Sequence, residues 1–201
     1  ALPRRTRHGA AISALAAGGD WEGFERQARW ALDERVALPW LREVMLQAYL
    51  FIGYPRAIQA LQILTRCGPE EEQGQFWTDA ARRPEWGPRG RNLCERIYGP
   101  QFRPLLSVMR RTHPELAEWM IREGYGKVLS RPFLGAKVRE LCVVSLLTAQ
   151  RSWPQLEAHL SGALRVGATH ATLAEAVETG AQMAPETEKS RALRLVQKAR
   201  P

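Results

Sequence analysis

An internal repeat is the feature of this sequence that most limits the folds it can adopt. Residues 7–49 align with residues 139–181 without a gap, at a constant offset of 132. Ten of the 43 aligned positions are identical, among them Trp21 with Trp153 and Glu43 with Glu175. Because repeated segments are expected to form the same structural unit twice, a repeat constrains the fold before any single element is assigned. We therefore expect a fused tandem duplication.

The repeated segment has the periodicity of helices. In the second copy, apolar residues recur at three- and four-residue spacing from Leu141 to Thr148, which predicts a helix ending near Gln150. Ser152 with Gln155 predicts a capping box for a second helix. That helix runs to Gly167, a typical residue after a helix end, and Thr169 is expected to cap a third helix over 172–184.

The first copy predicts the same order of helices, over about 6–17, 21–35 and 39–52, with Asp20 at the cap position that matches Ser152. A break at Gly53 and Pro55 precedes a further helix over 56–66. Residues 67–92 contain four glycines and three prolines and are predicted to be a linker. The predicted organisation is therefore a first repeat over 1–66, a linker over 67–92, and a second repeat over 93–201.

The second repeat is expected to begin with helices near 91–98 and 101–110. A third helix over 112–124 follows, for which Thr112 and Glu115 predict another capping box, and residues 124–134 form a connector. A final helix is expected over 186–199. No segment has the alternation of a strand, so the predicted fold is all-α, a helical bundle with two repeats related by pseudo-twofold symmetry.

Composition excludes several classes of protein. With 201 residues, 45% hydrophobic and 25% charged, the chain has the composition of an ordinary globular protein. The net charge of +8 permits nucleic-acid binding, but the basic residues are spread along the chain, so none is expected. No apolar run is long enough to span a membrane and the first residues lack a signal-peptide core, so we expect a cytoplasmic protein without a membrane partner. The three cysteines form no CxxC and predict neither a disulfide framework nor a metal site.

Glu140 and His159 are the two groups of the second copy best suited to moving a proton near neutral pH. The imidazole is the candidate acid or base, and the carboxylate is the candidate partner that fixes its tautomer. Arg139 and Arg131 are candidate clamps for a substrate carboxylate, because a guanidinium offers a planar pair of donors. The alternative is that all four side chains form ordinary surface ion pairs or satisfied groups in the core.

Several segments of the second copy together resemble the carboxymuconolactone decarboxylase family, which includes the AhpD-like alkylhydroperoxidases. They are YGKVLSRPFL, RELC, and LEAHLSGALRVGAT with His159, followed by Glu175. The Gln/Tyr tail that usually closes this pattern is absent from the second copy, whereas the first copy has it over 47–55. His8 and Gln27 occupy the first-copy positions that match Glu140 and His159, so each copy keeps a different part of the pattern.

The resemblance implies an AhpD-like fold and helps to choose between activities. Peroxidase members carry a CxxC before the histidine, whereas this chain has Ser152 and Gln155 there, so a thiol peroxidase is disfavoured. The decarboxylase members, which use no cofactor, are the closer match. The implied activity is proton-transfer and decarboxylation chemistry on a small carboxylated lactone or related acid, with His159 and Glu140 as the catalytic pair.

Two further expectations follow from the resemblance. Family members with one copy assemble as rings of dimers, so a fused pair implies a trimer that mimics a hexamer. The rival function is that of a non-catalytic helical oligomer or small-ligand-binding protein, because the motifs are divided between the copies. The sequence leaves open the substrate and whether a pocket forms within one chain or between chains.

Overall fold

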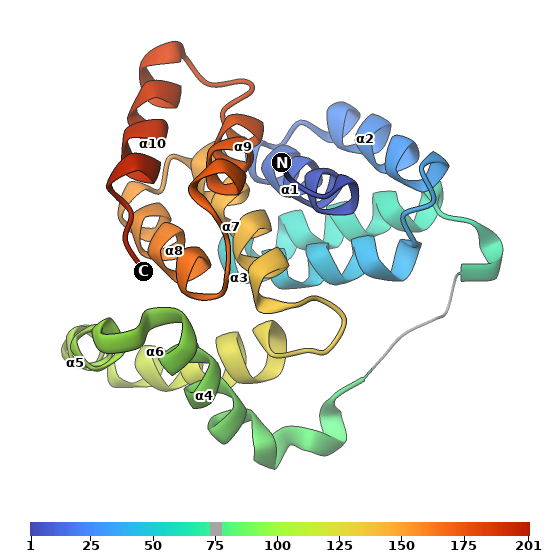
Figure 1. The fold of residues 1–201 in the computed structure, drawn as a ribbon. Helices are drawn as coiled ribbons and strands as arrows, with labels where there is room; N and C mark the ends of the chain where they lie inside the picture. Colours follow the sequence, from blue (N-terminus) through green and yellow to red (C-terminus); the bar gives the residue numbers. More distant parts are fainter. Residues whose placement is uncertain (73–77) are drawn as a thin grey trace. The chain divides into compact units, whose positions relative to one another are not determined.

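The computed structural model describes residues 1–72 and 78–201, and within these ranges every regular element is helical (Figure 1). The prediction of an all-α fold is confirmed. The chain forms two compact units. Unit 1 comprises Ala1–Phe76 with Phe133–Pro201, and unit 2 comprises Trp77–Pro132.

The first half of unit 1 contains α1 (Arg4–Gly18), α2 (Trp21–Asp33), α3 (Leu38–Cys67) and the short 3-10 turn η1 (Glu70–Glu72). The Asp20 carboxylate accepts a hydrogen bond from the Gly23 amide at 2.9 Å, so this predicted cap of α2 is confirmed. Gly53 interrupts α3 with φ 75° and ψ 167°. The two predicted helices over 39–52 and 56–66 are the parts of α3 on either side of this break.

The second half of unit 1 contains α7 (Ala136–Gln150), α8 (Trp153–Arg165), α9 (His170–Gly180) and α10 (Glu186–Lys198). Thr169 and Thr172 form a reciprocal capping box at the start of α9, so this predicted cap is confirmed. The predicted box at Ser152 is wrong, because the Ser152 side chain makes no capping hydrogen bond. Pro154 at the second helical position has no N–H, which removes one of the two amides that a cap side chain normally binds.

Helices α1 and α7 pack directly against each other in the core of unit 1. Gly9 permits this approach, since a Cβ atom there would lie 2.8 Å from the Trp40 ring and 3.0 Å from the Cys142 sulfur. Side chains of these two helices and of the helices around them are less than 2% exposed, including Ile12, Phe24, Leu41, Leu146 and Leu160. Residues from both predicted copies therefore form one hydrophobic core.

Positions 132 residues apart share unusual backbone geometry. Gly19 (φ 78°) corresponds to Arg151 (φ 58°), and Arg35 (φ 62°) corresponds to Gly167 (φ 94°). Arg35 and Arg151 are the two residues other than glycine with positive φ within the ranges described here. Each arginine thus adopts a left-handed conformation near the end of a helix, and the residue 132 positions away is a glycine in the same conformation.

Side-chain contacts recur at the same offset. Arg7 Nη2 donates to the Leu2 carbonyl at 3.3 Å, and Arg139 Nε donates to the Leu134 carbonyl at 3.2 Å. Arg7 pairs with Glu175 at 3.8 Å, and Arg139 pairs with Glu43 at 2.9 Å. In both cases an arginine of one copy reaches the matching glutamate of the other copy.

Unit 2 contains η2 (Ala80–Glu85), α4 (Trp86–Tyr98), η3 (Gly99–Gln101), α5 (Phe102–Thr112), α6 (Pro114–Trp119) and η4 (Met120–Leu129), which is a π-helix. The predicted helix over 112–124 is right in that the chain is helical from Pro114 onward, but its predicted end is wrong, because α6 passes at Trp119 into a π-helix that continues through much of the predicted connector. The Thr112 cap is also wrong. Its hydroxyl donates to the Val108 carbonyl, and His113 is the residue at the start of α6.

Close backbone contact between α4 and η4 organises unit 2. A Cβ atom at Gly90 would collide with the Ile121 carbonyl, and one at Gly126 would collide with the Trp86 carbonyl. The hydroxyls of Tyr98 and Tyr125 form a hydrogen bond of 2.6 Å between the same two helices. The predicted boundaries of the linker and second repeat stay a prediction, and residues 73–77 of that linker lie outside the described residues.

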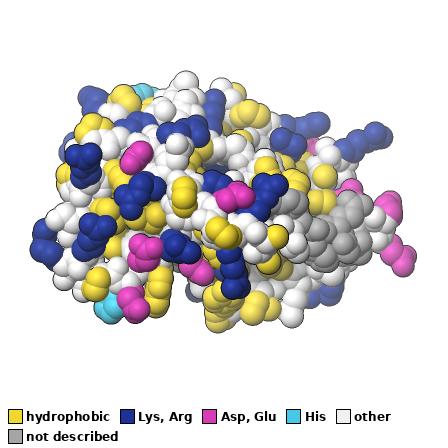
Figure 2. Space-filling model, turned by 90° about the horizontal axis from the view of Figure 1, so that it is seen from below, with side chains coloured by type: hydrophobic (Ala, Val, Ile, Leu, Met, Phe, Trp, Pro, Cys, Tyr) yellow, Lys and Arg dark blue, Asp and Glu magenta, His cyan; other side chains and the backbone are white. Residues whose placement is uncertain are grey.

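On the face drawn in Figure 2, Lys and Arg side chains are scattered among acidic and hydrophobic ones instead of forming a continuous patch. Among the residues described, no helix is both long enough and apolar enough to cross a membrane.

Candidate active site

Glu140 on α7 and His159 on α8 form a buried hydrogen bond. The distance between His159 Nδ1 and Glu140 Oε2 is 2.8 Å. Glu140 is 1% exposed and His159 is 7% exposed. The two residues that the sequence suggests as a catalytic pair are therefore in direct contact, across the hairpin that α7 and α8 form.

The hydrogen bond determines which ring nitrogen of His159 is available. An ionised carboxylate only accepts, so Nδ1 carries the hydrogen and donates it to Glu140. Nε2 makes no hydrogen bond to any group in the described part of the chain. Nε2 is thus the nitrogen that can exchange a proton with a bound molecule.

Phe51, from α3 in the first copy, lies against His159. The two ring centroids are 5.6 Å apart and the rings meet at 75°, an edge-to-face arrangement. Gln150 Nε2 donates to the Phe51 carbonyl at 3.1 Å, which ties this part of α3 to the end of α7. The first-copy tail over 47–55 therefore contributes to the surroundings of His159.

Arg139, predicted as a clamp for a substrate carboxylate, is 1% exposed and already binds groups of the chain. Its Nη2 donates to Glu43 Oε1 at 2.9 Å, and its Nη1 donates to Gln47 Oε1 at 3.0 Å. Gln47 Nε2 in turn donates to the Arg139 carbonyl at 3.4 Å. This buried network joins α7 to α3 and fits a positioning role better than contact with a substrate.

Arg131, the other predicted clamp, follows η4 and belongs to unit 2. Its backbone amide donates to the Val128 carbonyl at 3.3 Å. Glu140 and His159 belong to unit 1, so Arg131 is not in the same unit as this pair. Its role in substrate binding stays a prediction.

His8, the first-copy residue that corresponds to Glu140, is a second buried histidine. Gln27 Nε2 lies 2.7 Å from His8 Nδ1, so the positions that correspond to Glu140 and His159 are joined by a hydrogen bond here too. His8 Nε2 lies 2.9 Å from Glu34 Oε2, and the Trp30 ring packs edge-on against His8. The hydrogen bond from His8 lowers the pKa of Glu34. Sequence reasoning identified His8 and Gln27 as a degenerate pair but missed Glu34, because nothing local marks it as a partner of α1.

The cysteines are in environments that suppress thiolate chemistry. Burial raises the pKa of Cys142 and of Cys94 to about 12, and burial also raises the pKa of Cys67. All three are free thiols. Near neutral pH they are protonated and weakly nucleophilic. In the ranges that the structure covers, no group of three or more His, Cys, Asp or Glu side chains is arranged to hold a metal ion.

The fold and this pair define a class of all-helical proteins with a histidine buried against a carboxylate. Residues 114–198, which include the pair, match the model of the carboxymuconolactone decarboxylase family. The chain is also similar to Peroxisomal protein 2 of Schizosaccharomyces pombe, with 33% identity over 132 residues. That match covers 65% of this chain and 62% of the relative, which is less than two thirds of the relative's length.

Proposed function

We propose that this protein is a cofactor-free enzyme of the carboxymuconolactone decarboxylase type. Its reaction is decarboxylation with proton transfer on a small carboxylated lactone or related acid. The observation that carries the proposal is the buried 2.8 Å contact between His159 Nδ1 and Glu140 Oε2. Such a pair, with the second ring nitrogen available, is the arrangement that general acid–base catalysis requires.

The proposed reaction balances without an oxidant or a metal. When the bond between the substrate and its carboxylate breaks, carbon dioxide leaves and the electron pair stays on the substrate as a carbanion or dienolate. His159, as an imidazolium, gives its Nε2 proton to that carbon and becomes neutral. It regains a proton from water after the product leaves. The Glu140 carboxylate stabilises the charged ring, and burial strengthens that interaction.

Neighbouring residues support the pair without entering the reaction. Phe51 limits access of water to one side of the imidazole. The network of Arg139 with Glu43 holds α3 and α7 together beside Glu140, and its removal is expected to disturb the site through position alone.

Turnover of 4-carboxymuconolactone, measured as carbon dioxide released, tests the proposal. Replacing His159→Gln is expected to lower the rate by at least about 100-fold, because a general acid commonly contributes that much. The matched control is His8→Gln, which alters the other buried, carboxylate-paired histidine and is expected to leave the rate within about twofold of the parent rate. Equal rates for His159→Gln and the parent protein would refute the assignment.

The second candidate function is a non-catalytic helical oligomer or binder of small ligands. The observation in its favour is that His8 is buried and carboxylate-paired as well, so such pairs also serve to join helices in this fold. A parent protein that binds carboxylated lactones saturably, yet releases no carbon dioxide from them, would favour this function.

We also infer that the chain arose by duplication and that its halves are related by pseudo-twofold symmetry. The paired positive-φ residues and the two reciprocal arginine–glutamate contacts support this inference. A trimer of such chains would contain six related helical modules. For location we propose the cytoplasm, with the peroxisome as the rival suggested by the name of the relative. Imaging of the tagged full-length protein distinguishes the two.

A further inference from the structure

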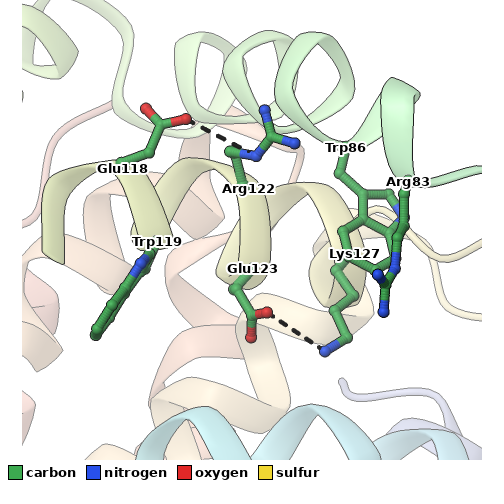
Figure 3. A pocket seen from close by; sticks show the side chains of 7 residues that line it. All are labelled: Arg83, Trp86, Glu118, Trp119, Arg122, Glu123 and Lys127. Atoms are coloured by element: carbon green, nitrogen blue, oxygen red, sulfur yellow. Dashed lines mark hydrogen bonds and ion pairs between the residues drawn. The ribbon is translucent and has the colours of Figure 1, made fainter. Parts of the chain in front are cut away.

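A cleft in unit 2 has a chemical character that the proposed reaction does not use. It has a volume of about 530 Å³ and is lined by residues of η2, α4, α6 and η4 (Figure 3). Seven side chains line it: Arg83, Trp86, Glu118, Trp119, Arg122, Glu123 and Lys127. This volume is within the range of sites for small molecules.

One end of the cleft carries an exposed aromatic side chain. Trp119, the last residue of α6, is 55% exposed and stands apart from the charged side chains in Figure 3. A tryptophan is costly to leave in water and presents a broad face for stacking. Its indole thus offers a surface for an aromatic ring.

The other end of the cleft is positive. Trp86 lies under two cations, with Lys127 Nζ at 5.5 Å and the Arg83 guanidinium carbon at 5.7 Å from its ring. Such contacts hold a cation beside an aromatic face while leaving its donors available. Arg83 has no ion pair within the described ranges, so its charge is not neutralised by a neighbouring carboxylate.

The two acidic residues of the cleft are each bound to a neighbour on the same helical surface. Glu118 lies 3.8 Å from Arg122, and Glu123 lies 3.5 Å from Lys127. The two residues of each pair are four positions apart and solvent-exposed, so each pair is weak and exchanges readily for another partner. An incoming anion can therefore share Lys127 with Glu123.

We propose that this cleft is a binding site for a planar aromatic anion, such as an aryl carboxylate. The aromatic ring stacks on Trp119, and the anionic group faces Lys127 and Arg83 beside Trp86. This site is built from unit 2 alone, and it does not depend on the chemistry assigned to His159.

The probe for the test is 2-naphthoate, added to the full-length ¹⁵N-labelled protein while the indole N–H signals are followed by NMR. The signals of Trp119 and Trp86 are expected to shift saturably, with a dissociation constant of about 1 mM or lower. The neutral 2-naphthamide and the non-aromatic cyclohexanecarboxylate are each expected to bind at least about tenfold more weakly, because each lacks one of the two recognised features.

Variants distinguish binding of 2-naphthoate at this cleft from non-specific binding elsewhere on the protein. Trp119→Ala is expected to weaken binding at least tenfold, whereas Trp30→Ala, which removes an indole of the same 55% exposure from unit 1, leaves binding unchanged. Glu123→Gln is expected to tighten binding about threefold, because Lys127 then has no competing carboxylate. Misfolding cannot produce such a gain. An unsaturable response, equal binding of the amide, or equal affinity of Trp119→Ala would overturn the proposal.

Discussion

The hydrogen bond between Glu140 and His159 satisfies two residues that would each be costly to bury alone. A carboxylate removed from water without a partner destabilises the fold strongly, and an imidazole N–H in the core also needs an acceptor. The 2.8 Å contact meets both needs. The same bond that makes the pair suitable for proton transfer is therefore one reason why α8 packs against α7.

Ser145 on α7 presents the opposite case. It is fully buried, and its hydroxyl has no hydrogen-bond partner within the described residues. Ser145→Ala is expected to raise the free energy of unfolding by about 1 kcal/mol, because it removes an unsatisfied buried hydroxyl. Chemical denaturation measures this change.

The matched control for Ser145 is Ser13, the corresponding residue of the first copy. Its hydroxyl donates to the Gly9 carbonyl at 2.7 Å. Ser13→Ala is therefore expected to lower stability, or to leave it unchanged, in the same denaturation experiment. A loss of stability in Ser145→Ala would contradict the view that its hydroxyl is unsatisfied.

At the scale of elements, the ends of α2 and α7 carry backbone strain. Arg35 and Arg151 are exposed and adopt left-handed conformations, which cost a residue other than glycine about 1–2 kcal/mol. Arg151→Gly is expected to stabilise the fold by about 0.5–1 kcal/mol, after allowance for the greater flexibility of glycine in the unfolded chain. The reverse change at the corresponding position, Gly19→Arg, should destabilise it. Thermal unfolding of both variants tests the argument, which fails if Arg151→Gly lowers the midpoint.

The contact of α1 with the end of α2 makes stability depend on pH. The hydrogen bond from His8 lowers the pKa of Glu34 below its usual 4.5, and Arg4 lies 3.5 Å from the same carboxylate. A carboxyl group with a lowered pKa stabilises the fold above its unfolded pKa, and this contribution is lost as pH falls through the folded pKa. On acidification from about pH 6 to about pH 3, Glu34→Gln is expected to lose less stability than the parent protein. An identical loss in both proteins would contradict this role for Glu34.

Helix ends were predictable where a local rule acts alone. Asp20 and Thr169 cap their helices as expected, because each side chain finds an amide of the following turn. Ser152 does not, since Pro154 alters that turn. The π-helix at 120–129 was not predictable, because Gly126, which looks like a residue of a connector, is required by the approach of the Trp86 backbone.

At the scale of the whole molecule, residues from both predicted copies converge within unit 1. Glu140 and His159 were identifiable because they are the two groups of a predicted helical hairpin that are suited to moving a proton near neutral pH. Glu43 was not identifiable as the partner of Arg139, because a contact across 96 positions depends on how the predicted copies pack. Sequence periodicity carries no information on that packing.

The proposed assembly is also a property of the whole molecule. A chain with two related modules is expected to form a trimer, so the mass measured by light scattering should be about three times the chain mass of 22.7 kDa. A single species with the mass of one chain would contradict this expectation, and it would leave the assignment of His159 intact.

The most direct test of the proposed chemistry is the reaction of 4-carboxymuconolactone in deuterated water, with carbon dioxide release and deuterium in the product measured together. We predict one deuterium incorporated for each carbon dioxide released by the parent protein, and loss of both signals in His159→Gln. Glu140→Gln should reduce both in proportion, because it leaves the ring in place without the carboxylate that stabilises its charged form. Undiminished release and incorporation in His159→Gln would contradict the account.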